Sequence, residues 1–289
     1  MYNKIPSLPV GIRIEEEALY DEHLHVSVPI NQTAKMMLLE VDGVKNMEEI
    51  VHNLSQTFEE VEEDRLFDDT VNLFHDLSQN YILNWKGGSV SKWKSILFQF
   101  LFRYNPRYRE RFNLSDKGFF AIFLKILWIV VQKIAIFWVL FMAASLVLYI
   151  YAPFDFILYA SYYYTVTYAG LIVSFALHET MHAYMHRRMT QEQIGFLAAD
   201  WMSIRFVRPI IKPYPKKMLW VTLLGPLVPG MIGIVGLLLM CTVVNVGNMA
   251  TYTLHTIFGL FALHIFYLLP FTGDGKSLVK QLSYYRLES

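Results

Sequence analysis

The chain has 289 residues, of which 54% are hydrophobic and only 17% are charged, and its mean hydropathy is +0.32. Soluble globular domains carry about 25% charged residues, so this composition predicts an unusually large apolar surface. The formal net charge of zero hides a division, because residues 1–90 hold 17 acidic and 6 basic side chains whereas residues 91–289 hold 8 and 19. The acidic first part argues against a nucleic-acid partner, which would require basic side chains.

The single cysteine, Cys241, excludes an intramolecular disulfide framework and a zinc site built from several cysteines. Residues 1–17 contain no apolar core of the kind that precedes a signal-peptide cleavage site. We therefore expect no cleavable signal peptide.

Residues 1–90 are predicted to form a small cytoplasmic α+β domain with winged-helix character. Two β-type runs, at 10–15 and 24–30, contain alternating apolar residues. The acidic segment 16–23 between them is typical of a turn.

Three helices and a strand are expected to complete this domain. The first helix should begin after Asn31 and end at the Asp-Gly pair 42–43. The second covers 47–58 and the third about 63–79, because each repeats apolar residues at helical spacing. Residues 81–85 are predicted to return as a strand.

The order AKMMLLEVDGVKNMEEIVHNL followed by VNLFHDLSQNYIL resembles the PqqD-like peptide-recognition domains, which hold leader peptides of ribosomally made, modified peptides. The resemblance covers residues 8–85. It implies that a peptide binds as an added strand at a sheet edge beside a helix. The alternative is a small cytoplasmic domain that has other partners or only aids assembly.

Four apolar segments predict an α-helical membrane protein, because a helix needs about 20 apolar residues to cross a bilayer. They are residues 134–152, 156–177, 218–244 and 249–269. Residues 119–133 are apolar but carry Lys125 and Lys133, so we interpret them as an interfacial helix, with a fifth span as the alternative. Residues 91–133 are then a basic juxtamembrane linker and interfacial helix, and residues 134–289 the membrane domain.

Loop charges predict the orientation of these spans. Residues 187–217 carry seven basic and two acidic side chains, whereas the connections at 153–155 and 245–248 contain no lysine or arginine. By the positive-inside rule, both termini and the 187–217 loop are expected to be cytoplasmic.

Residues 178–182 read HETMH, a match to the H-E-x-x-H pattern. On a helix this spacing places His178 and His182 on one face, where both imidazoles can bind a single zinc ion. Glu179 lies one residue further round the helix, where it can accept a proton from a water activated by the metal. An ionisable residue that follows an uncharged 22-residue run is costly in a membrane, which favours a functional role.

A catalytic zinc site requires a third protein ligand. The candidates are His186, Asp200, His264 and Asp274. His186 lies eight residues after His178, about 12 Å along a helix, which is too far for a shared ion. We expect His264, like His255, to be a satisfied intramembrane histidine, although His264 can also shape the site.

Asp274 is the favoured third ligand. It follows the last span in a segment where Pro270, Gly273 and Gly275 break the helix, and irregular backbone at membrane depth is tolerated where it lines a protected cavity. The predicted topology also places Asp274 on the same side of the membrane as the HETMH motif.

HETMH, LLGPLVPG at 223–230 and LLPFTGDG at 268–275 together resemble the site-2 protease family of intramembrane zinc metallopeptidases. The resemblance covers about residues 134–280. It implies that His178, His182 and Asp274 bind zinc and that Glu179 is the catalytic base. The chain has Tyr267 where the family has an asparagine, so the role of that asparagine toward substrate or transition state is unassigned.

Glycine and proline are frequent in the third span and allow two interpretations. The segment is either kinked, giving a peptide or water access to the zinc, or closely packed through small residues. The residues concerned are Gly225, Pro226, Pro229, Gly230, Gly233 and Gly236.

The two resemblances together imply a zinc endopeptidase that cleaves a ribosomally made, modified peptide during its maturation or export, similar to the metalloproteases proposed for bacterial epipeptide systems. The implied partners are the precursor or modified peptide, the lipid bilayer of a bacterial cell membrane, a peptide-modifying enzyme and an ABC-type exporter. One alternative is a regulatory site-2 protease that releases a membrane-bound transcription regulator. Another is a non-catalytic receptor with a relic zinc site. A membrane di-iron oxygenase would need several histidine clusters.

Overall fold

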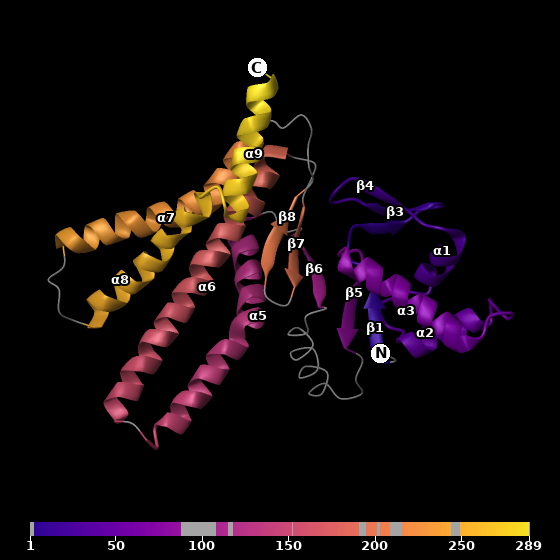
Figure 1. Cartoon of the computed structure of the whole chain (residues 1–289), viewed down its shortest axis with the longest axis horizontal. Helices are drawn as coiled ribbons and strands as arrows, with labels where there is room; N and C mark the ends of the chain where they lie inside the picture. Colours follow the sequence, from indigo (N-terminus) through magenta and orange to yellow (C-terminus); the bar gives the residue numbers. More distant parts are fainter. Residues whose placement is uncertain are drawn as a thin grey trace. The chain divides into compact units, whose positions relative to one another are not determined.

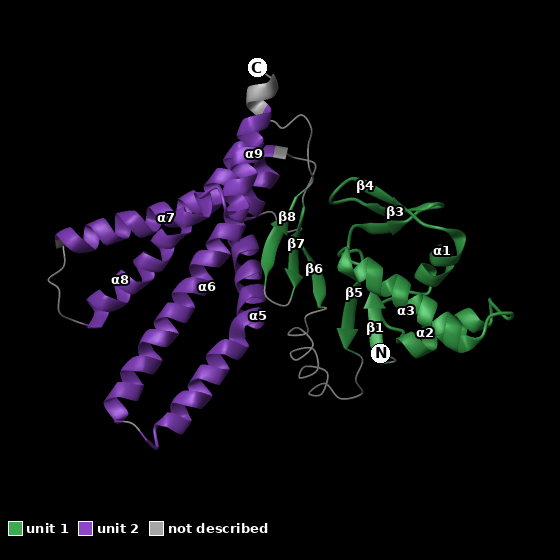
Figure 2. Cartoon of the chain, in the orientation of Figure 1, with its two compact units in different colours: residues 1–115, 192–209 green, residues 116–191, 210–289 purple. Residues whose placement is uncertain are grey.

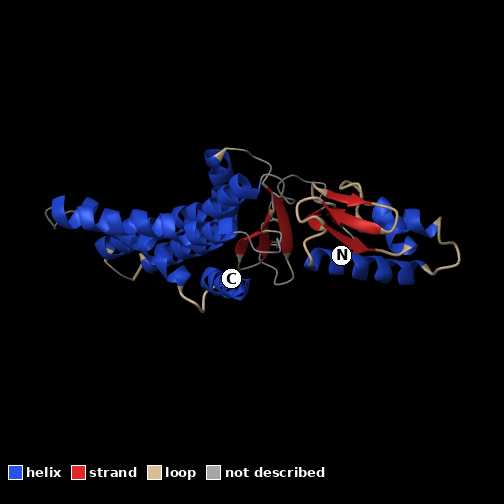
Figure 3. Cartoon of the chain, turned by 90° about the horizontal axis from the view of Figure 1, so that it is seen from above, coloured by secondary structure: helices blue, strands red, loops and turns tan. Residues whose placement is uncertain are grey.

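The computed structural model describes residues 3–87, 108–114, 118–151, 153–190, 195–200, 203–208, 216–243 and 249–288. The chain divides into two compact units, of which unit 1 comprises residues 1–115 and 192–209 and unit 2 comprises residues 116–191 and 210–289 (Figures 1 and 2). All the described strands belong to unit 1, and the described part of unit 2 consists of helices and their connections (Figure 3).

Unit 1 contains a three-stranded antiparallel sheet in the order β2 (Ile12–Ile14), β3 (Ala18–Asp21) and β4 (Val26–Pro29). The middle strand lies in the acidic segment that was predicted to be a turn, so that prediction was wrong. Leu19 of β3 is buried in the core of the unit, and the strand is hydrogen-bonded on both sides, to β2 and β4.

A second, two-stranded sheet pairs β1 (Lys4–Ser7) with β5 (Asn84–Gly87) in antiparallel register. The pattern of the sequence did not predict β1. The strand expected at 81–85 begins three residues later, because Tyr81 adopts a positive φ of 60° and directs the chain into a turn.

The three predicted helices of unit 1 are confirmed as α1 (Gln32–Leu39), α2 (Met47–Ser55) and α3 (Glu63–Gln79). The Asn31 side chain caps α1 by accepting a hydrogen bond from the Ala34 N–H at 2.8 Å. Asn46 and Glu49 form a reciprocal capping box at the start of α2. One face of each helix packs with Leu19, Leu83 and Trp85 into a common core.

A third sheet, which was not predicted, joins β6 (Arg109–Asn113), β7 (Phe196–Asp200) and β8 (Ile204–Val207) in antiparallel order. It brings together segments that precede α5 and follow α6 along the chain. The loop expected at 187–217 therefore contains two strands, and unit 1 is larger than the predicted 1–90 domain.

Arg111 of β6 connects this third sheet to the rest of unit 1. Its guanidinium donates two hydrogen bonds to the Asp21 carboxylate, at 2.5 and 2.8 Å, and lies 4.0 Å from the centre of the Phe196 ring. The Asn84 side chain donates to the Arg111 carbonyl at 3.0 Å and accepts from the Arg111 N–H at 2.9 Å. Both charged groups are buried, so this bidentate pair depends on each partner being present.

Unit 2 contains five α-helices among its described residues: α5 (Phe119–Leu148), α6 (Phe154–Thr190), α7 (Lys216–Val243), α8 (Met249–Ala262) and α9 (Gly273–Glu288). A 3₁₀ helix, η1 (Leu263–Leu268), continues α8. Four stretches of the described chain are long and apolar enough to cross a membrane: 119–148, 154–189, 217–242 and 249–284. These correspond in order to the four predicted spans.

Helix α5 differs from the prediction, because residues 119–133 are not a separate interfacial helix or an additional span. They form the first half of one unbroken helix with residues 134–148. Ile122, Ile126 and Ile129 are buried at helical spacing, and Lys133 is buried four residues after Ile129 on the same face.

Glycines of α7 permit close packing against α8 and η1. A Cβ at Gly233 would overlap the backbone of Ala262, and one at Gly236 would overlap the Phe258 ring. Both prolines lie inside α7, which is assigned as helix from 216 to 243. The small residues here therefore serve helix packing, as the second of the two interpretations predicted.

Candidate metal centre

The HETMH motif lies inside α6, which continues beyond it to Thr190. The two histidines meet as the spacing predicted. Their Nε2 atoms are 3.1 Å apart, and both side chains are buried. A single helical element thus supplies two nitrogen ligands that point to one place.

Asp274 reaches these histidines from the first turn of α9. The predicted helix break is confirmed, because a turn separates η1 from α9 at residues 269–272. The Thr272 carbonyl accepts a hydrogen bond from the Lys276 N–H at 2.9 Å as α9 begins. A Cβ at Gly275 would overlap the Leu269 carbonyl, so only glycine fits immediately after Asp274.

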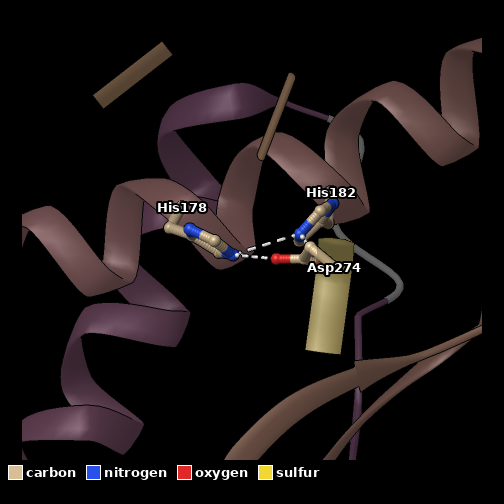
Figure 4. A group of neighbouring side chains, drawn as sticks. All are labelled: His178, His182 and Asp274. Atoms are coloured by element: carbon tan, nitrogen blue, oxygen red, sulfur yellow. Dashed lines mark hydrogen bonds and ion pairs between the residues drawn. The ribbon is translucent and has the colours of Figure 1, made fainter. Parts of the chain in front are cut away.

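The structure brings the three predicted ligands together (Figure 4). The Asp274 carboxylate lies 3.0 Å from His178 Nε2 through one oxygen and 3.3 Å from His182 Nε2 through the other. Ligand atoms that surround zinc tetrahedrally at about 2.0–2.1 Å lie about 3.3 Å from one another. The separations in this triad are therefore close to those that a metal ion requires, and the donor set of two imidazoles and a carboxylate suits one.

A hydrogen bond at the ring nitrogen remote from Asp274 favours this orientation of His182. His182 Nδ1 lies 2.8 Å from the Val221 carbonyl of α7, which can only accept, so Nδ1 carries the ring proton and Nε2 is the acceptor atom of the neutral ring. Gly225, one turn further along α7, provides the space, because a Cβ there would overlap the His182 ring.

His264 of η1 is in contact with the triad, which agrees with the alternative that it shapes the site. Its Nδ1 lies 3.1 Å from His178 Nδ1, and its side chain is buried. The His264 and Tyr267 rings are nearly parallel with centroids 5.4 Å apart, and the Tyr267 ring lies 5.0 Å from that of His178. Tyr267 thus lies beside His178 and His264.

Glu179 is only 7% exposed. The Asp274 side chain is 22% exposed, whereas that of His178 is 3% exposed. The triad is therefore enclosed on its histidine side and accessible on its carboxylate side. Three protein ligands leave one position of a tetrahedral ion open.

The remaining candidates lie outside this group. His186 is fully buried further along α6 and does not belong to the triad. Asp200 belongs to β7 in unit 1, where its carboxylate accepts hydrogen bonds from the Ser203 N–H and hydroxyl at 2.8 Å. His255 meets the Thr251 carbonyl of its own helix at 2.8 Å, as expected for a satisfied histidine.

Sequence reasoning missed the supporting residues of this site. The Val221 carbonyl and the space above Gly225 depend on how α7 packs on α6, and no local pattern reports it. The three-residue spacing of His264 and Tyr267 was a usable signal, because a 3₁₀ helix places such residues directly above one another. The chain matches no protein-family model, no curated protein and no solved structure.

Proposed function

We propose that this protein is a membrane-embedded zinc metalloprotease that hydrolyses a peptide bond in a ribosomally made, modified peptide during its maturation or export. The observation that carries the proposal is the convergence of His178 Nε2, His182 Nε2 and the Asp274 carboxylate around one point, with Glu179 adjacent on the same helix. The metal is proposed to be zinc because peptidases with H-E-x-x-H helices use it.

A position within the membrane is supported by the surface of unit 2. Large apolar side chains are exposed on all four candidate spans, including Leu140 of α5, Phe156 of α6, Leu238 of α7 and Leu254 of α8. Lipid is the environment that stabilises such a surface, whereas water does not. The basic 187–217 segment, and the connections at 153–155 and 245–248 that contain no lysine or arginine, support cytoplasmic termini.

The residues around the triad have distinct roles in the proposed reaction. A bound zinc ion supplies Lewis-acid polarisation of the scissile carbonyl and lowers the pKa of water to about 7. Glu179 accepts a proton from the attacking water and transfers it to the leaving amine. Enclosure by α6, α7 and η1 limits the access of bulk water, which strengthens these electrostatic effects.

Peptide capture is assigned to unit 1, which has a cavity of about 400 Å³ between its three-stranded sheet and α3. The lining is mainly apolar and comes from both sides: Ile12, Leu19, Asp21, Leu24, Val26, Val28, Leu73, Asp76, Leu77, Asn80 and Ile82. β4 is an edge strand of this sheet, with β3 as its only partner among the described residues. An extended peptide can therefore pair with β4 while its apolar side chains enter the cavity.

The metal content of the detergent-purified chain, measured by mass spectrometry, tests the centre first. We expect near-stoichiometric zinc in the wild type and in His186→Ala, and its loss in Asp274→Ala. Zinc that persists in Asp274→Ala but disappears in His186→Ala would show that the third ligand is wrong. A folded wild type without zinc would indicate a receptor with a relic motif.

Hydrolysis is tested with Glu179→Gln, which keeps the shape of the side chain and removes its basicity. Proteoliposomes are incubated with synthetic peptides that join a leader to a core, and products are identified by mass spectrometry. We expect cleavage by the wild type and none by Glu179→Gln, with equal zinc in both. Equal loss of zinc would contradict the assignment of Glu179 as base.

Peptide capture by the cavity of unit 1 is tested with Leu77→Arg, which places a charge in the apolar lining of that cavity. We expect weaker binding of the leader peptide and unchanged zinc content. Binding that is unaltered in this variant would remove unit 1 as the site of capture. If the wild type and Leu77→Arg both cleave isolated transmembrane peptides in preference to leader-bearing peptides, the regulatory site-2 protease is favoured instead.

A further inference from the structure

We infer that His264 is a positioning residue for the metal centre, acting through His178. The inference rests on the proposed function, because it concerns the same three ligands. His264 lies on η1, a different element from the HETMH helix, and is 5% exposed. Its Nδ1 is 3.1 Å from the Nδ1 of His178, which is the nitrogen of that ring that faces away from Asp274.

The hydrogen-bond partners determine which ring atom carries each proton. Binding a cation through Nε2 requires the proton of neutral His178 to be at Nδ1, from which it is donated to Nδ1 of His264. His264 must then carry its own proton at Nε2. Its acceptor atom therefore selects the tautomer of His178 that can bind a metal, as the Val221 carbonyl does for His182.

Two features of the fold hold His264 in this place. The 3₁₀ geometry of η1 aligns His264 with Tyr267, and the two rings are inclined by only 17°. Gly230 and Gly233 of α7 allow η1 and the end of α8 to approach closely. A Cβ at Gly230 would overlap Ile265 of η1, and a Cβ at Gly233 would overlap Ala262, the last residue of α8. The hydrogen bond to His178 thus links the end of α8 to the centre of α6.

This arrangement predicts a contribution to metal affinity, because the partners that orient ligating histidines are typically worth about 10–100-fold in affinity. His264→Leu removes the acceptor Nδ1 and fills its place with an apolar side chain of similar size. His264→Asn keeps a polar atom close to the position of Nδ1. His255→Leu is the matched control, since His255 lies on α8 about 13 Å before His264 and bonds only within its own helix in the described contacts.

The zinc dissociation constant is measured on the detergent-purified full chain by competition with a chromophoric chelator. We expect His264→Leu to bind zinc about 10–100-fold more weakly, His264→Asn to lie closer to the wild type, and His255→Leu to equal it. The visible absorption of the Co²⁺-loaded proteins should change in His264→Leu and not in His255→Leu, because it reports ligand geometry.

Unchanged zinc affinity in a His264→Leu protein that elutes like the wild type would overturn the inference. If that variant does not fold, His264→Asn is compared with His264→Gln, which has the same polar group one bond further out. The inference predicts tighter zinc binding by His264→Asn, and equal affinities would contradict it. A wild type without zinc would overturn the proposed function itself, whereas zinc held equally by all variants would overturn only the role of His264.

Discussion

Two carboxylates in this chain, the buried Asp21 of unit 1 and the partly exposed Asp274 of unit 2, have partners of opposite kinds. Asp21 accepts two hydrogen bonds from the Arg111 guanidinium and two more from the N–H groups of His23 and Leu24. Asp274 faces the Nε2 atoms of two imidazoles, at 3.0 and 3.3 Å. The guanidinium is permanently charged, so it completes the first site within the protein, whereas the second set of atoms is the kind that a cation completes.

The comparison teaches that a buried acidic group does not by itself indicate function. The nature of its partner distinguishes a structural ion pair from a ligand set. Arg111 and Asp21 connect two sheets of unit 1, and neither would gain from an additional cation. Around Asp274, three side chains from two helices direct their acceptor atoms to a common point.

The largest effect should come from exchanging each carboxylate for its neutral amide. Asp274→Asn is expected to weaken zinc binding by at least about 100-fold and to abolish peptide hydrolysis, because a charged ligand is lost. Asp21→Asn should leave the zinc affinity unchanged. Mass spectrometry of bound metal and chelator competition measure both. A similar loss of zinc in the two variants would break the comparison.

Removal of the arginine should have the next largest effect, confined to unit 1. Arg111→Met leaves the Asp21 charge buried without its main partner, which costs about 3–5 kcal/mol of stability. Hydrogen–deuterium exchange of residues 3–87 in the full chain measures the loss. The double variant with Asp21→Asn should recover part of the protection, and failure to do so would mean that Arg111 acts through packing alone.

A smaller effect is expected at Gly225, where α7 meets the His182 ring. Gly225→Ala should displace that ring and weaken zinc binding by about 10-fold, comparable to loss of an orienting contact. Gly259→Ala on α8 is the control, because no atom lies within 4 Å of the added Cβ. Equal zinc affinities for the two variants would show that the ring tolerates the methyl group.

The smallest expected effect is an acid-dependent loss of stability in unit 1, through Asp21. Burial raises the pKa of Asp21, but the hydrogen bonds and charge of Arg111, with the N–H groups of His23 and Leu24, outweigh burial and lower that pKa below its ordinary value. The stabilisation is therefore complete above the unfolded pKa of about 3.9 and is lost as pH falls through the folded value. Exchange of residues 3–87, corrected for intrinsic rates, should increase in that acid range in the wild type and much less in Asp21→Asn.

Local patterns predicted the parts of the fold that depend on near neighbours. Asn31 marked the start of α1, and the four-residue spacing of His178 and His182 placed two ligands on one face. Strand β3 and the third sheet were missed. The third sheet joins segments that are distant in the chain, as Arg111 pairs with Ala198, so no local pattern predicts it. Strand β3 pairs with its chain neighbours β2 and β4 although its acidic surroundings are typical of a turn.

The sequence by itself determined which side chains can bind a metal and which helices are long enough to cross a membrane, because spacing and hydropathy are properties of a single segment. Tertiary structure alone decided that Asp274 approaches the histidines, that the Val221 carbonyl orients His182, and that His264 contacts His178. These relations join α6 to α7, η1 and α9. They depend on glycine-mediated helix packing, and the energy of such packing arises between segments rather than within one.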